Sequence, residues 1–185
     1  MKQLLPGTTI DIEIDRPDAA ERIFVPMFLT GGLFLSQVSE ITGLSPYVVQ
    51  NWVKRGFVPP PENKRYSRER VSRILLINML KDTLQIEKIL DLIRYSNAHL
   101  KPGQPGYLDD RSVYEDFVAA LFWCGGGMPA GGEMELAVRR VAHGREPGFP
   151  GADKRLEKVL SIMLLAYISS RLQREAEQRL AGLDL

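Results

Sequence analysis

The chain of 185 residues is 44% hydrophobic and 25% charged, which is typical of a folded globular protein and excludes wholesale disorder. Its single cysteine, Cys124, excludes an intrachain disulfide and a cysteine-only metal site. No signal sequence opens the chain and no apolar stretch is long enough to span a bilayer, so we expect a cytoplasmic protein without membrane contact. The net charge is only +1, so any evidence for nucleic-acid binding must lie in how the charges are distributed.

The N-terminal segment, residues 1–30, is expected to form an arm. Thr9 to Asp15 alternate apolar and acidic side chains, which is the period of a strand, but the sequence offers no obvious partner strand. Gly31-Gly32 predicts a break before the first clearly helical unit.

Two short helices joined by a tight turn are predicted next. Ser36 is the expected N-cap of the first helix, and Gly43 is the expected end. Ser45-Pro46 then opens a second helix that should run to about Arg55. This is the pattern of a helix-turn-helix, in which the second helix enters the major groove of DNA.

The second helix carries the clearest chemical signal. At about 100° per residue, one face holds Tyr47, Gln50, Asn51 and Lys54, and the opposite face is apolar. The polar face therefore presents two amides, a phenol and a cation but no carboxylate. Asn and Gln can pair with adenine, and Lys can reach guanine or phosphate, so this face favours nucleic acid over plain solvation.

A basic loop follows the second helix. Three prolines, Pro59 to Pro61, exclude helix there, and Ser67 is the predicted N-cap of a third helix. Lys64, Arg65 and Arg68 place three cations within five residues, which would repel one another unless a polyanion lies nearby. Residues 36–73 hold seven basic and three acidic side chains, hence +4. A solvated basic loop is the alternative interpretation.

Four segments in this order resemble the DNA-binding domain of MerR-type transcription regulators: residues 35–46, 51–60, 64–67 and 80–89. The whole chain is also similar to an uncharacterised bacterial family of MerR-like proteins, a domain of unknown function numbered 1836. The resemblance implies a mainly α fold, with a MerR-like winged helix-turn-helix domain over residues 31–98 followed by an all-helical C-terminal region. The sequence departs from the MerR type at Gln50-Asn51, where the family usually carries Arg-Tyr, and at Lys64, where its wing usually carries Arg.

These features predict sequence-specific binding of double-stranded DNA by a bacterial transcriptional regulator that is not an enzyme. The alternative is a helical protein-interaction module that retains the winged fold without binding DNA. The candidate DNA-binding residues are Ser36, Gln37, Ser45, Tyr47, Gln50, Asn51, Lys54, Lys64, Arg65, Tyr66 and Arg68.

The C-terminal region, residues 99–185, is expected to serve in dimerisation or sensing. Its predicted helices cover about 109–124, 133–142 and 153–180. The last has a broad apolar face that suits either the core or a homodimer: Leu156, Val159, Leu160, Met163, Leu164, Tyr167 and Ile168, extended by Leu172, Ala176 and Leu180.

A cluster of apolar side chains near the glycine run suits either a pocket for a small-molecule effector or the core: Phe117, Phe122, Trp123, Cys124 and Met128. Cys124 is widely spaced from both histidines, His99 and His143, which argues against a metal site or a nucleophilic pair. No metal, cofactor or catalytic residue is therefore assigned.

Overall fold

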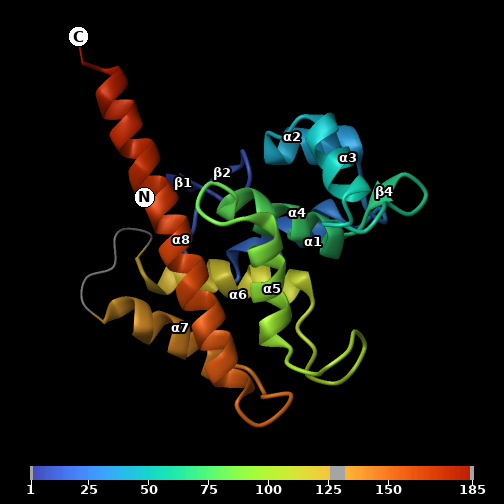
Figure 1. Cartoon of the computed structure of the whole chain (residues 1–185), viewed down its shortest axis with the longest axis vertical. Coiled ribbons are helices and arrows are strands. Elements are labelled where there is room, and N and C mark those ends of the chain that lie inside the picture. Colours follow the sequence, from blue (N-terminus) through green and yellow to red (C-terminus); the bar gives the residue numbers. More distant parts are fainter. Residues whose placement is uncertain (1, 126–131, 184–185) are drawn as a thin grey trace.

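The computed structural model describes residues 2–125 and 132–183 and is mainly α, as predicted (Figure 1). Its helices are α1 (Ala19–Met27), α2 (Leu35–Thr42), α3 (Pro46–Lys54), α4 (Arg68–Leu80), α5 (Ile86–Ser96), α6 (Asp110–Trp123), α7 (Glu133–His143) and α8 (Ala152–Ala181). Its strands are β1 (Lys2–Leu4), β2 (Asp11–Glu13), β3 (Leu33–Phe34) and β4 (Arg65–Tyr66). The predicted helices from α2 onward are present, with ends within about two residues of those expected.

The N-terminal segment is not a free arm. The predicted strand β2 pairs antiparallel with β1, and Leu5 and Phe24 are buried in the core. The Tyr114 hydroxyl on α6 donates to the carbonyl of Pro6 at 2.7 Å, and the Thr9 hydroxyl donates to the carbonyl of Glu40 at 2.8 Å. The segment therefore ties α6 to the end of α2.

The predicted turn between α2 and α3 is confirmed, with one change at the start of α2. Gly43 adopts the left-handed conformation, with φ of 70°, and Ser45 stands at the N-cap of α3. Ser36, however, lies inside α2 rather than at its N-cap. The side-chain oxygen of Gln37 instead accepts from the Phe34 backbone N–H at 2.9 Å, so Gln37 satisfies that donor.

The predicted basic loop is a tight two-residue turn. Glu62 and Arg65 exchange two backbone hydrogen bonds, and Asn63 and Lys64 between them have φ values of 48° and 64°. Positive φ at both central residues defines a type I′ hairpin turn. The following strand β4 pairs with β3, with Phe34 opposite Arg65. This pairing fixes the turn beside the start of α2.

Helix α4 lies at the centre of the fold. Most of its side chains are buried, and it packs against α2, α5, α6 and α8. Buried side chains from Leu5 to Tyr167 form one continuous cluster. Packing therefore continues across residue 98, where the sequence suggested the end of a first domain.

The apolar face predicted for the last helix belongs to the core over its first half. Six of its side chains have exposures of 6% or less: Leu156, Val159, Leu160, Met163, Leu164 and Tyr167. Beyond Arg171 every described residue of α8 is exposed, and this last third of the helix projects away from the other elements (Figure 1). No helix in the described part of the chain combines the length and apolar character needed to cross a membrane.

Candidate nucleic-acid interface

The polar face of α3 is open to solvent. Tyr47 is 74% exposed, Gln50 and Lys54 are exposed, and Asn51 is half-buried. Val49 and Trp52 are buried, as the helical period predicted. Helix α3 carries no carboxylate, so its exposed face offers a phenol, an amide and an ammonium group.

Helix α3 and the turn that precedes β4 lie at the same end of the molecule, away from α7 and the projecting end of α8 (Figure 1). Lys64 is exposed in that turn. Among the described residues, neither Lys54 nor Lys64 forms an ion pair, so both ammonium groups are available to an external anion.

Most of the other cations in this region are paired within the chain. Arg68 contacts Glu115 at 2.6 Å, Arg73 contacts Asp110 at 2.6 Å, and Arg70 contacts Glu62. A looser pair joins Arg55 to Glu87 at 3.4 Å. Of the three cations whose repulsion was inferred from the sequence, only Arg68 is paired with a carboxylate, so phosphate is not required to explain Arg68.

Arg65 is also engaged within the chain. Its guanidinium donates to the Gly32 carbonyl at 2.9 Å and lies 4.1 Å from the centre of the Phe34 ring. Tyr66 is only 3% exposed and the Arg68 side chain 14%, so neither can contact DNA without a rearrangement. Burial also raises the pKa of the Tyr66 hydroxyl.

Of the predicted site residues, seven are exposed: Ser36, Gln37, Ser45, Tyr47, Gln50, Lys54 and Lys64. Asn51 and Arg65 are half-buried. The candidate surface is therefore narrower and less basic than the sequence suggested. We define it as Tyr47, Gln50 and Lys54 on α3 together with Lys64.

The cluster predicted as either a pocket or core has features of both: Phe117 and Cys124 are buried, whereas Trp123 is 37% exposed and, with Cys124, borders a hollow of about 330 Å³. Phe117 is buried edge-on against Tyr167, and the Arg140 guanidinium covers the Trp123 ring at 3.5 Å. Burial, with the carboxylates of Glu133 and Glu135, raises the pKa of the Cys124 thiol to about 11, so this thiol is protonated at neutral pH. Met128 lies outside the described residues.

A hollow of about 410 Å³ that sequence reasoning missed lies between the N-terminal segment, the end of α4 and α8. Its lining includes three cations, Lys81, Arg171 and Arg174, and two carboxylates, Asp82 and Glu175. These residues come from distant parts of the chain, so no local pattern could identify them as neighbours. The hollow offers a place for a small molecule, but the effector remains a prediction.

Residues 32–117 match the model of a family described as Domain of unknown function (DUF1836). The match confirms the resemblance to that family over this segment, which contains the candidate surface and all four arginine–carboxylate pairs described above. The chain matches no curated protein and no solved structure.

Proposed function

We propose that this protein binds double-stranded DNA, with α3 entering the major groove. Tyr47, Gln50 and Lys54 face the base edges and Lys64 reaches a phosphate. The observation that carries the proposal is the exposed face of α3, which presents an amide, a phenol and an ammonium group without any carboxylate. A solvated helix face ordinarily mixes both signs of charge. The amide of Gln50 matches the donor and acceptor pair of adenine in the major groove.

Non-specific affinity should be low, because few cations are available. Each phosphate that a cation neutralises contributes about 0.9 to the dependence of log affinity on log salt concentration. Lys54 and Lys64 therefore predict a slope of about 2 per protomer. Base contacts must supply much of the binding free energy, and Gln50 is the best placed side chain for this.

A second copy of the chain is the partner we propose for the exposed side of α8. Ile162, Leu165, Leu172 and Leu180 are between 44% and 58% exposed. With Ser169 and Ala176 they recur every three or four residues, so all six fall within one narrow stripe, which we call the α8 seam. The seam keeps Leu172, Ala176 and Leu180 from the face that the sequence suggested for dimerisation, whereas the earlier part of that face, from Leu156 to Tyr167, is buried in the core. A two-fold dimer would present two copies of α3 to a palindromic site.

The test is a titration of genomic DNA fragments at two salt concentrations. We expect Lys54→Ala/Lys64→Ala to weaken binding to all sequences and to lower the salt slope by about 1 per lysine. A matched control is Lys101→Ala/Lys154→Ala, which removes two exposed cations outside the candidate surface and should leave the slope unchanged. Gln50→Ala should reduce discrimination between sequences more than it reduces non-specific affinity.

The internal pairing of the arginines favours a second candidate function, a helical protein-interaction module. An absence of binding at low salt would contradict the DNA proposal and favour this alternative. Equal loss in the control double variant would show that binding reflects overall charge and not α3. A role in transcription rests on the resemblance to MerR-type regulators, since the residues themselves indicate only DNA.

A further inference from the structure

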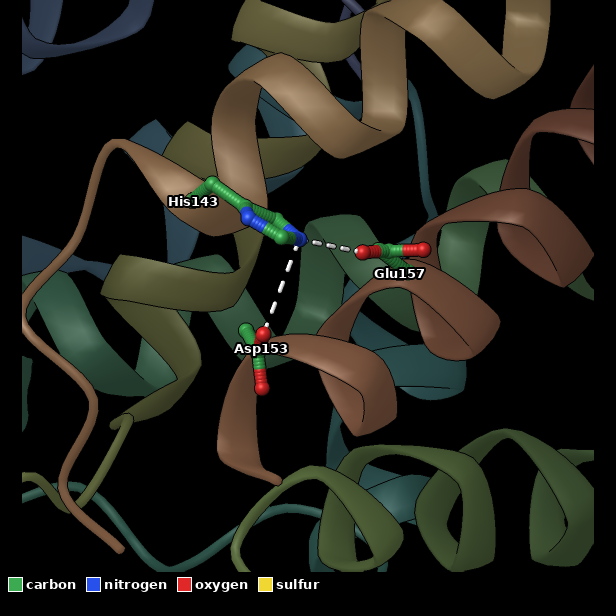
Figure 2. Close-up of side chains that lie close together, drawn as sticks. All are labelled: His143, Asp153 and Glu157. Carbon is green, nitrogen blue, oxygen red and sulfur yellow. Dashed lines mark hydrogen bonds and ion pairs between the residues drawn. The ribbon is translucent and has the colours of Figure 1, made fainter. Parts of the chain in front are cut away.

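Three metal-ligating side chains meet where α7 ends and α8 begins (Figure 2). His143 is the last residue of α7, and Asp153 and Glu157 lie one turn apart on α8. The His143 Nε2 atom is 2.6 Å from Glu157 Oε1 and 3.6 Å from Asp153 Oδ2. The three donor atoms lie within 4.8 Å of one another, so one imidazole nitrogen and two carboxylate oxygens converge on one point.

We propose that His143, Asp153 and Glu157 bind a divalent first-row transition-metal ion, for which Zn²⁺ is a suitable probe. An imidazole with carboxylates is a ligand set that such ions accept, whereas Mg²⁺ and Ca²⁺ prefer oxygen ligands alone. The two carboxylates balance the two positive charges of the ion. Sequence reasoning missed this site because it considered His143 only with Cys124.

The two separations that involve His143 need little adjustment to hold an ion, and the two carboxylate oxygens lie within 4.8 Å of each other. Zinc–ligand distances of about 2.0–2.2 Å place tetrahedral ligand atoms about 3.4 Å apart. The separation of His143 and Asp153 already fits, and the contact of His143 with Glu157 must lengthen by less than about 1 Å. The metal would then replace the proton that this hydrogen bond shares.

The surroundings also permit an ion to enter. The side chains of His143, Asp153 and Glu157 are 52%, 30% and 23% exposed, so an ion can reach them and water can complete its coordination. Both carboxylates lie four residues apart on a single helix, which holds them at a constant separation. α7 and α8 pack closely against each other, so the third ligand is held beside them.

A hydrogen-bonded ion pair between the two helices is the competing explanation for this cluster. The variant His143→Gln distinguishes a metal site from an ion pair. A glutamine amide can still donate a hydrogen bond to Glu157, but it is a poor metal ligand. If the cluster is only an ion pair, the wild type will bind no metal at these residues.

The experiment titrates the metal-free full chain with Zn²⁺ against a competing dye and follows the histidine ring signals by NMR. The chain has only two histidines, and His99 packs beside Phe149, so the two rings report separately. We expect one ion per chain, with a shift of the His143 signals but not those of His99. Loss of an outer-shell partner weakens metal binding by about 10–100-fold. His143 and Asp153 are proposed as direct ligands, so His143→Gln and Asp153→Asn should each weaken zinc binding by more than about 100-fold.

The matched control is His99→Gln, which should bind Zn²⁺ as the wild type does. Excess Mg²⁺ or Ca²⁺ should not displace the zinc. The absence of saturable binding, or unchanged binding by His143→Gln, would overturn the proposal. The site lies on α7 and α8, away from α3, so neither result bears on the DNA proposal (Figure 1).

Discussion

Lys64 has a strained backbone conformation and a positive charge that we propose contacts a DNA phosphate. Two single substitutions distinguish the effect of the strain from the effect of the charge. Its φ of 64° is left-handed, which costs a side chain with a Cβ about 1–2 kcal/mol. Lys64→Gly creates Asn-Gly, the preferred pair for a type I′ turn. Glycine loses more chain entropy on folding, so we expect a net gain of about 0.5–1 kcal/mol in the free energy of unfolding, measured by urea denaturation.

Lys64→Ala is the matched control, since it removes the charge without relieving the strain. Both variants should weaken DNA binding equally, and only Lys64→Gly should gain stability. Equal stability of the two variants would show that the turn is not strained at this position.

Asp116 on α6 predicts an unusual dependence of stability on pH. Burial raises the pKa of its carboxyl to about 6, although Arg145 opposes the shift at 2.7 Å. The folded state therefore binds this proton more tightly than the unfolded state, whose pKa is near 3.8. The contribution of Asp116 to the free energy of unfolding is fully present below about pH 4 and is lost as pH rises through about 6. The change amounts to about 3 kcal/mol.

Asp116→Asn cannot lose a proton and should remove this slope. We expect the free energy of unfolding of the variant to increase relative to that of the wild type by about 2–3 kcal/mol between pH 4 and 6. Chemical denaturation at several pH values measures the difference. Parallel curves for the two proteins would mean that Asp116 ionises normally.

At the scale of elements, the ion pair between α4 and α6 predicts that Arg68 stabilises the fold and does not bind DNA. Arg68 and Glu115 are 14% and 22% exposed, and burial raises the pKa of Glu115 despite the nearby guanidinium. Arg68→Met removes the closer partner of a mostly buried pair and leaves Glu115 with Arg111 at 3.9 Å, so the substitution should cost about 3 kcal/mol, at the low end for such pairs. Adding Glu115→Leu should recover most of that loss.

A double-mutant cycle by urea denaturation measures this coupling. The double variant should also keep the DNA affinity and the salt slope of the wild type, because Arg68 lies outside the candidate surface. A fall in the salt slope of the folded double variant would show that Arg68 contributes to DNA binding.

Local signals predicted the elements well, whereas contacts between distant residues could not be predicted. Gly43 and Ser67 mark helix ends through their own backbone conformation or hydrogen bond, and both predictions are confirmed. Helix α1 was not predicted, because residues 1–30 were expected to form an arm. The partners of Arg68 and Arg73 are 47 and 37 residues away along the chain. The sequence therefore showed these positive charges but could not predict which carboxylates pair with them.

At the scale of the whole molecule, the α8 seam predicts self-association. Leu165 and Leu172 are 57% and 46% exposed on a helix of 30 residues whose last third, beyond Arg171, projects from the body. Helices that expose such a stripe bury it against a partner helix. Sedimentation equilibrium should give a dimer for the wild type and a monomer for Leu165→Glu/Leu172→Glu. Leu29→Glu, at a position 78% exposed outside α8, should remain dimeric. A monomeric wild type at micromolar concentration would exclude the proposed dimer, and α3 would then bind a single half-site.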